Sequence, residues 1–162
     1  MAQVVTALGS NLNDRLSYMR EAKAFLEELS IKDALASSIY ESEPVGPSEF
    51  EFLNGVIIIE TNLSPLDLLQ EFKNFEHSHD RPTRYPKWTP RTIDLDIICY
   101  DDLKTQQDKL VIPHPEYSNR RFVLEPLAEI QPSFKDPVSG KSIKELLIDA
   151  PVMKLDRTSL SW

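Results

Sequence analysis

A chain of 162 residues, 41% hydrophobic and 27% charged, has the size and composition of one globular domain, which we expect over residues 1–162. Its net charge of −8 argues against a nucleic-acid-binding protein, because such proteins usually carry a basic surface. The single cysteine, Cys99, excludes an intrachain disulfide, and no apolar run reaches the ~20 residues of a membrane span, so we expect a cytoplasmic protein without a membrane partner.

The first half of the chain predicts three strands and one helix. The N-terminal stretch lacks a signal-peptide layout, and residues 4–8 instead predict a short apolar strand that ends at a Gly-Ser-Asn turn. Apolar residues at helical spacing predict a helix over residues 14–29. Residues 34–41 predict a second strand, and residues 52–61, which contain the apolar run VIII, predict the strongest strand.

The second half begins with a clearly marked helix. Ser64 is a typical N-cap and Pro65 suits the first helical position, so we expect a helix to begin there. After it we expect strands over 93–100 and near 110–112, one or two short helices within 113–130, and a last helix over 142–148. The order β-α-β-β-α-β predicts the α+β class: a ferredoxin-like, antiparallel-rich sheet with helices packed on one face, plus short C-terminal elements.

Two aspartates interrupt the apolar strand expected over residues 93–100. Because side chains alternate along a strand, Asp94 and Asp96 point the same way, about 6.6 Å apart. Leu95, Ile97 and Cys99 then point toward the core. Two carboxylates this close repel each other unless a cation lies between them, and hard oxygen ligands suit Mg²⁺. The solvated face of an edge strand is the alternative explanation of the same pattern.

A basic, proline-rich stretch precedes this strand. Residues 81–91 contain four cations and no acid: Arg81, Arg84, Lys87 and Arg91. Because arginine favours bidentate phosphate contacts, an acid pair beside this stretch indicates a site for a magnesium-bound nucleotide. An ordinary solvated loop is the alternative. The glycine-rich phosphate-binding motifs of P-loop enzymes and protein kinases do not occur in the sequence.

Five segments of the chain carry recognisable motifs. They are ALGSNLNDR at 7–15, SIYESEPVGP at 38–47, EFLNGVIIIET at 51–61, WTPRTIDLDIICY at 88–100 and PHPEYSNRRFVLEPLAEI at 113–130. In order and spacing they resemble the motifs of the 6-hydroxymethyl-7,8-dihydropterin pyrophosphokinase family of folate biosynthesis. That family transfers the β,γ-diphosphoryl group of ATP to the pterin's hydroxymethyl group and releases AMP. The resemblance implies ATP and the pterin as partners, and we expect a monomer.

The resemblance also implies a catalytic and nucleotide-binding set. Asp94 and Asp96 would hold two Mg²⁺ ions as cofactors, and the implied catalytic residues are Arg81, Arg91, Asp94 and Asp96. The implied ATP-binding residues are Glu76, Arg81, Arg84, Trp88, Arg91, His114 and Arg120. Arg84 is offset by one position from the family's usual basic residue. Without the resemblance, His114 could simply end a turn and Arg120 could cap a short helix.

A second set is implied for the pterin. Its members are Ser42, Glu43, Val45, Phe52, Asn54, Trp88 and Phe122. Aromatic rings would stack on the flat pterin, and Asn54 would pair with its hydrogen-bonding edge. Without the resemblance, core aromatics are the favoured explanation of Phe52 and Phe122, and Asn54 could satisfy a neighbouring backbone group.

Some positions depart from the family pattern. Asp80 stands where glycine is usual and adds a negative charge near the expected phosphate site, and Lys73 replaces a common glutamine. The intact acid pair favours a magnesium-dependent enzyme, whereas Asp80 leaves open a non-catalytic relative that binds a nucleotide or pterin in a regulatory role. We further expect residues 80–91 to be a mobile lid. Its Trp88 would report nucleotide binding by fluorescence after deletion of Trp162.

Overall fold

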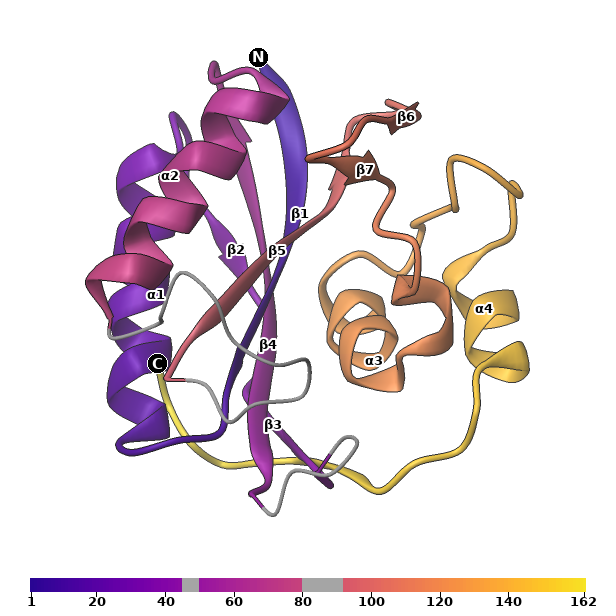
Figure 1. The fold of residues 1–162 in the computed structure, drawn as a ribbon. Helices are drawn as coiled ribbons and strands as arrows, with labels where there is room; N and C mark the ends of the chain where they lie inside the picture. The colour runs from indigo at the N-terminus through magenta and orange to yellow at the C-terminus, as the bar shows by residue number, and fades with distance from the viewer. Residues whose placement is uncertain (45–49, 80–91) are drawn as a thin grey trace.

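An antiparallel sheet forms the centre of the fold in the computed structural model, which describes residues 1–44, 50–79 and 92–162 (Figure 1). Its strand order is β5-β1-β4-β3-β8, and β2 also pairs with β4. The long strands are β1 (Ala2–Ser10), β4 (Phe52–Thr61) and β5 (Asp94–Tyr100); the short ones are β2 (Leu35–Ala36), β3 (Tyr40–Ser42) and β8 (Leu155–Arg157). A separate hairpin joins β6 (Thr105–Gln106) to β7 (Val111–Ile112).

Helices cover both faces of this sheet. One face carries α1 (Arg15–Leu29) and α2 (Pro65–Ser78), and the other carries α3 (Arg121–Ile130) and α4 (Ile143–Asp149) (Figure 1). The mixture of helices and antiparallel strands agrees with the expected α+β class, but the expectation that helices pack on one face is wrong. The reason is visible in β4, where four consecutive apolar residues are all at most 7% exposed. A strand buried on both sides needs a layer on each.

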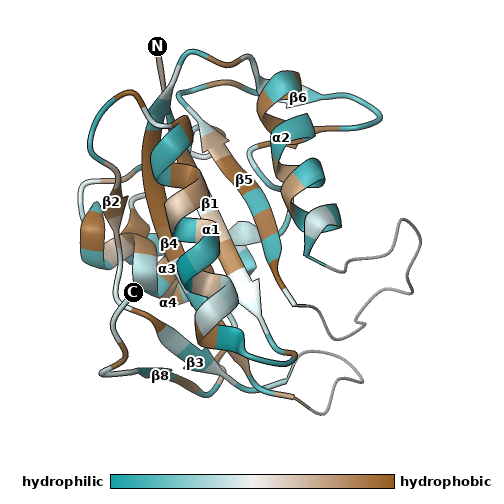
Figure 2. Ribbon diagram, turned by 90° about the vertical axis from the view of Figure 1, so that its left-hand side faces the viewer, coloured by the Kyte–Doolittle hydropathy of each residue, from teal (hydrophilic) through white to brown (hydrophobic). Residues whose placement is uncertain are grey.

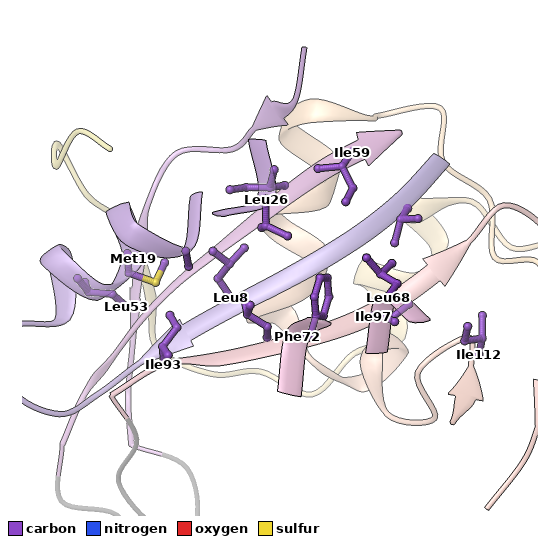
Figure 3. Close-up of a cluster of buried hydrophobic side chains, with 14 of the residues drawn as sticks. Leu8, Met19, Leu26, Leu53, Ile59, Leu68, Phe72, Ile93, Ile97 and Ile112 are labelled. Carbon is purple, nitrogen blue, oxygen red and sulfur yellow. The ribbon is translucent and has the colours of Figure 1, made fainter. Parts of the chain in front are cut away.

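The two faces hold separate hydrophobic cores. Under α1 and α2, Met19, Leu26 and Phe72 belong to one cluster with Ile57 and Ile59 of β4. Figure 3 shows part of this cluster. On the other side, α3 and α4 cover the remaining β4 residues of the apolar run, Val56 and Ile58. Figure 2 shows a brown stretch along the apolar run of β4, whereas α1 and α2 alternate between brown and teal. The helices are therefore amphipathic and this run of β4 is not.

Local signals set the ends of the helices. Asp14 caps α1 by accepting a hydrogen bond from the Ser17 amide at 3.1 Å, and Ser64 caps α2 by accepting from the Asp67 amide at 3.2 Å. Pro65 occupies the first turn of α2, as predicted. In the described part of the chain, no helix has the length and apolar composition needed to cross a membrane.

Three details of the sheet differ from expectation. Residues 34–41 form no continuous strand, because β2 and β3 are separate, and β8 was not predicted. A register shift in β5 follows from a bulge: Thr6 pairs with Ile97, but Val5 pairs with Cys99. Ile97 therefore packs under α2, whereas Cys99 packs under α3 and α4, so the expectation that both point to the same side is wrong.

Candidate active site

The paired aspartates lie on β5, at one edge of the sheet. Asp94 pairs with Gly9 and Asp96 with Ala7 of β1, and both carboxylates are half-buried. Leu95 between them packs into the core under α1 and α2, so the aspartates face the side covered by α3. The structure thus places both carboxylates on one strand face.

A third carboxylate supports this edge from the opposite side. Glu76 on α2 is only 3% exposed, and its Oε2 accepts a hydrogen bond from the Leu95 amide at 2.8 Å. A buried carboxylate is costly unless it is hydrogen-bonded, and an edge strand has amides that lack a strand partner. Glu76 therefore fastens α2 to β5 at the residue that separates the two aspartates.

A cleft of about 420 Å³ opens along this edge. Its walls come from α2, β5, the residues leading into β7, and the segment from His114 to Arg120. Five predicted site residues line it: Glu76, Asp94, Asp96, His114 and Arg120. Two cations that were not predicted as site residues, Lys73 and Lys109, also line it. Acidic groups and cations therefore share one cleft, which suits a polyanion carried with a divalent cation.

His114 is held in one orientation at this cleft. Its backbone amide donates to the Ile98 carbonyl at 2.8 Å, which fixes the residue beside β5. Its ring Nδ1 accepts from the Glu116 amide at 3.2 Å, which leaves the proton on Nε2. Burial and the nearby Arg120 guanidinium lower the pKa of His114, against weaker opposing effects of Glu116 and Asp94. A neutral imidazole with an Nε2–H donor results.

Arg120 and Phe122 lie together at the start of α3. The Arg120 guanidinium makes an ion pair with Glu116 at 3.0 Å and lies 5.6 Å from the centre of the Phe122 ring. Neither side chain is fully buried: that of Arg120 is 24% exposed, and Phe122 is half-buried at the rim of the second core. Both keep surface that a ligand can contact.

A row of residues crosses the sheet from the aspartates toward β3. Gly9 of β1 pairs with Asp94 on one side and with Asn54 of β4 on the other, and Asn54 pairs in turn with Tyr40 of β3. With neighbouring strands about 4.8 Å apart, the Cα atoms of Asp94 and Asn54 are roughly 10 Å apart. An acid and an amide therefore flank a residue without a side chain.

Gly9 leaves this row open. A Cβ built there would lie 3.6 Å from the Phe52 ring and 3.8 Å from Asn54 Oδ1, both ordinary contacts. The backbone at Gly9 is not in the left-handed region, so glycine is not needed for the chain's conformation. Because Gly9 has no side chain, no side chain stands between Asp94 and Asn54 in this row.

Asn54 itself is oriented by β3. Asn54 is 3% exposed, and its Nδ2 donates to the Ser42 hydroxyl at 2.8 Å. Ser42 is 2% exposed, and the next residue, Glu43, exchanges hydrogen bonds with Lys154. The orientation of the buried amide is thus fixed by a buried hydroxyl.

The sequence of the chain was compared with those of known proteins. Residues 5–132 match the family model described as 7,8-dihydro-6-hydroxymethylpterin-pyrophosphokinase, HPPK. The chain belongs to the HPPK family. It is 42% identical over 144 residues to the 2-amino-4-hydroxy-6-hydroxymethyldihydropteridine pyrophosphokinase of Synechocystis sp., covering 88% of this chain and 73% of the relative. It is 41% identical over 142 residues to the Bacillus subtilis enzyme of that name, and the match covers 86% of this chain and 84% of that enzyme.

Solved structures agree with the HPPK fold. The Plasmodium falciparum HPPK-DHPS wild type with STZ-DHP superposes with a TM-score of 0.68 at 16% identity. The match covers 90% of this chain and 42% of that longer chain. The resemblance to this family drawn from the sequence is therefore confirmed, and with it the assignment to a family of diphosphokinase transferases.

Some predicted site residues lie outside the described part of this HPPK chain. They are Val45, Arg81, Arg84, Trp88 and Arg91, together with the lid expected over residues 80–91. Among the residues that the structure does describe, no group of three or more His, Cys, Asp or Glu side chains is arranged to hold a metal ion unaided. A magnesium site here would rest on the aspartate pair and on oxygen atoms from substrate and water.

Lys73, Lys109 and Gly9 are described positions that the sequence does not predict as site residues. Lys109 lies in a polar stretch between two short strands, and nothing in that stretch indicated that it borders the cleft. A glycine at the end of the first apolar run is a signal, but together with Ser10 and Asn11 it predicts a turn. In the structure it lies within β1.

Proposed function

We propose that this chain transfers the diphosphoryl group of ATP to the hydroxymethyl oxygen of 6-hydroxymethyl-7,8-dihydropterin in folate biosynthesis. The pterin oxygen bonds to the β-phosphorus, the bond between that phosphorus and the α–β bridging oxygen breaks, and AMP leaves while the hydroxyl loses its proton. The observation that carries the proposal is the row Asp94–Gly9–Asn54 beside the charged cleft. This row supports the proposal because the acid expected on the phosphate side and the amide expected to pair with the ring edge lie on one face of the sheet, two strands apart.

Asp94 and Asp96 fit a pair of Mg²⁺ ions. Both carboxylates are half-buried on one strand face, and each offers hard oxygen donors toward the cleft. Bound Mg²⁺ would neutralise phosphate charge and help orient the reacting oxygens. The protein's own part is to hold the two carboxylates at a fixed separation, which the pairing with β1 and the bond from Leu95 to Glu76 support.

The cleft residues suit the nucleotide. Phosphoryl-type transfer depends mainly on positioning and on stabilising charge. Lys109 and Arg120 supply positive charge, and the neutral His114 supplies an Nε2–H donor, on walls that converge on the aspartates. We include Lys73 and Lys109 with the ATP-binding residues expected from the sequence.

The pterin would lie over Gly9. There it would contact Asn54 at its polar edge and the half-buried Phe52 ring, with Phe122 on α3 completing the pocket. The family's ferredoxin-like frame is also part of the proposal. It is supported by the strand order β5-β1-β4-β3 and by antiparallel pairing between these strands.

Turnover tests the proposal. Purified chain is incubated with ATP, the pterin and Mg²⁺, and AMP and pterin diphosphate are separated by chromatography. We expect the two products in equal amounts, and we expect chelation of Mg²⁺ to stop both. Binding of ATP or pterin without product would support the alternative, a non-catalytic regulatory relative, and would contradict the proposed reaction.

A further inference from the structure

The last segment of the described chain, residues 154–162, lies across the edge of the sheet opposite β5. We infer that this segment, here called the strap, positions the pterin-binding strand β3 and is anchored by Trp162 in a socket made by Gly55. The inference rests on the proposed function, because it assigns the strap to the pterin side of that site. Figure 2 shows β8, the strand within the strap, beside β3.

The strap pairs with β3 through the three residues of β8. Ser42 pairs with Leu155 and Tyr40 with Arg157. Beyond the paired residues, the Glu43 amide donates to the Lys154 carbonyl at 3.2 Å, and the Lys154 amide donates back to Glu43 Oε1 at 3.1 Å. Thus Ser42, which orients Asn54, lies between two strands, and Glu43 is fixed on its backbone and side chain.

The end of the strap is anchored beneath α1. The Trp162 indole N–H donates to the Ser37 carbonyl at 2.7 Å, and Arg20 of α1 donates twice to the Ser161 carbonyl, at 3.1 and 2.8 Å. The tryptophan ring packs at the border of the first core. An aromatic ring with its N–H satisfied is a strong local anchor.

Gly55 makes room for that ring. A Cβ at Gly55 would lie 2.7 and 2.8 Å from two ring carbons of Trp162, closer than real side chains approach. Gly55 is the residue next to Asn54 on β4, so the same strand carries the amide that reads the ligand on one face and the socket on the other. The sequence alone gives Trp162 no role, whereas in the structure its ring fills the space beside Gly55 and its indole N–H donates to the Ser37 carbonyl.

The strap also connects β3 to α3. Arg157 reaches Glu129 of α3 at 3.4 Å, and the same carboxylate accepts hydrogen bonds from the Tyr40 hydroxyl at 2.8 Å and from Ser38. Since α3 begins at Arg121, next to Arg120 and Phe122, the strap joins two walls of the proposed site. Its loss is expected to loosen the pterin side and to leave the cleft beside β5 in place.

Amide exchange and binding measured together test the inference. In Trp162→Ala we expect exchange at residues 39–43 to accelerate by at least roughly 10-fold, because the outer pairing of β3 opens more often. We expect the pterin Kd, measured by calorimetry with a non-hydrolysable ATP analogue, to rise roughly 10-fold and the Kd of the analogue to stay within about 2-fold. Trp162→Phe should recover part of both effects. Leu160→Ala, an exposed residue of the same strap, is the matched control and should change neither.

The socket provides a second, independent variant. Gly55→Ala should reproduce the effects of Trp162→Ala, since the added methyl group displaces the ring. In the Trp162→Ala background the same change should add little, because residues that act through one contact are not additive.

Unchanged exchange at residues 39–43 in Trp162→Ala would overturn the inference, and so would equal losses of affinity for both ligands. A wild-type chain that binds the pterin but forms no product would contradict the proposed reaction alone and would leave this test valid.

Discussion

The two edges of the sheet are completed in different ways. At β5, the Glu76 carboxylate accepts a hydrogen bond from the Leu95 amide, and the His114 amide donates one to the Ile98 carbonyl. At β3, the short strand β8 pairs residue by residue along the edge. An edge completed by side chains and a loop leaves a cleft beside it, whereas an edge completed by another strand is closed to ligands and stiffened. The chain therefore combines a charged, accessible edge with a supporting one.

We expect the largest effect from removing the carboxylate charges on β5, the accessible edge. Asp94→Asn and Asp96→Asn should each lower turnover by at least ~10²-fold, because in the proposed reaction each carboxylate is a major electrostatic stabiliser of the Mg²⁺ and the phosphates. Steady-state rates at saturating Mg²⁺ provide the measurement, and thermal denaturation checks that the variants fold. Asp102→Asn, in the exposed turn after β5, is the control. If both site variants fold and keep near-normal turnover, the metal assignment fails.

The next largest effect is expected from removing the hydrogen bond that holds α2 to β5 at the same edge. Glu76→Leu should lower the free energy of unfolding by about 1–3 kcal/mol, because it leaves the buried Leu95 amide without its acceptor. Glu76→Gln keeps an acceptor oxygen and should lose less. Urea unfolding measures both variants, with the exposed Glu71→Leu on the same helix as control. Equal stability of Glu76→Leu and wild type would mean that the carboxylate does not hold α2 to β5.

A third variant tests the surface between the two edges. Gly9→Val should weaken pterin binding by roughly 10-fold, equivalent to about 1.4 kcal/mol, because its side chain fills the space between Asp94 and Asn54. Gly9→Ala should have a smaller effect. Calorimetry with the pterin and an ATP analogue gives the affinities, and the melting temperature of Gly9→Ala should stay close to that of wild type, since the added Cβ meets only ordinary contacts. Normal pterin affinity in Gly9→Val would place the ring elsewhere.

The smallest effect concerns the supporting edge and depends on pH. Burial alone would raise the pKa of Glu129, but hydrogen bonds from Tyr40 and Ser38 outweigh it and hold that pKa below its ordinary value. A carboxyl group with a lowered pKa in the folded state stabilises the fold above its unfolded pKa and loses that contribution as pH falls through the folded value. Glu129→Gln should therefore cost on the order of 1 kcal/mol at neutral pH.

The pH profile distinguishes this effect from a simple loss of packing. The stability difference between wild type and Glu129→Gln should shrink as the pH falls below about 4.5, the ordinary pKa of the group. Urea midpoints measured from pH 7 to pH 3 show this, with Glu125→Gln on the same helix as control. A difference that stays constant over this range would contradict a charged Glu129 as the hub between α3 and β3.

The accessible edge was largely predictable from the sequence, because its signals are local. The alternation of Asp94 and Asp96 with Leu95 fixed their shared face, and Ser64 with Pro65 marked the start of α2. The bulge in β5 was not predictable in this way, since it depends on how β5 is matched to β1. It reversed the side on which Cys99 lies.

The supporting edge was not predictable, because its contacts join distant parts of the chain. The three residues of β8 include an aspartate and an arginine and show no apolar alternation. Their partner strand lies more than a hundred residues earlier in the sequence, and Gly55 gives no hint that its empty side accommodates Trp162. The second helical layer could have been inferred from the unbroken apolar run in β4, which is typical of a strand covered on both faces.

The buried position of Cys99 has a practical consequence for studying this protein. Burial, and to a lesser extent the carboxylates of Asp136 and Asp102, raise the pKa of the Cys99 thiol to about 12. The thiolate is the reactive form, so the native chain is shielded from alkylating reagents and oxidants. A cysteine introduced at an exposed position such as Ser159 can then carry a single dye without removal of Cys99. The rate at which Cys99 itself is modified would then report how often β5 opens to solvent.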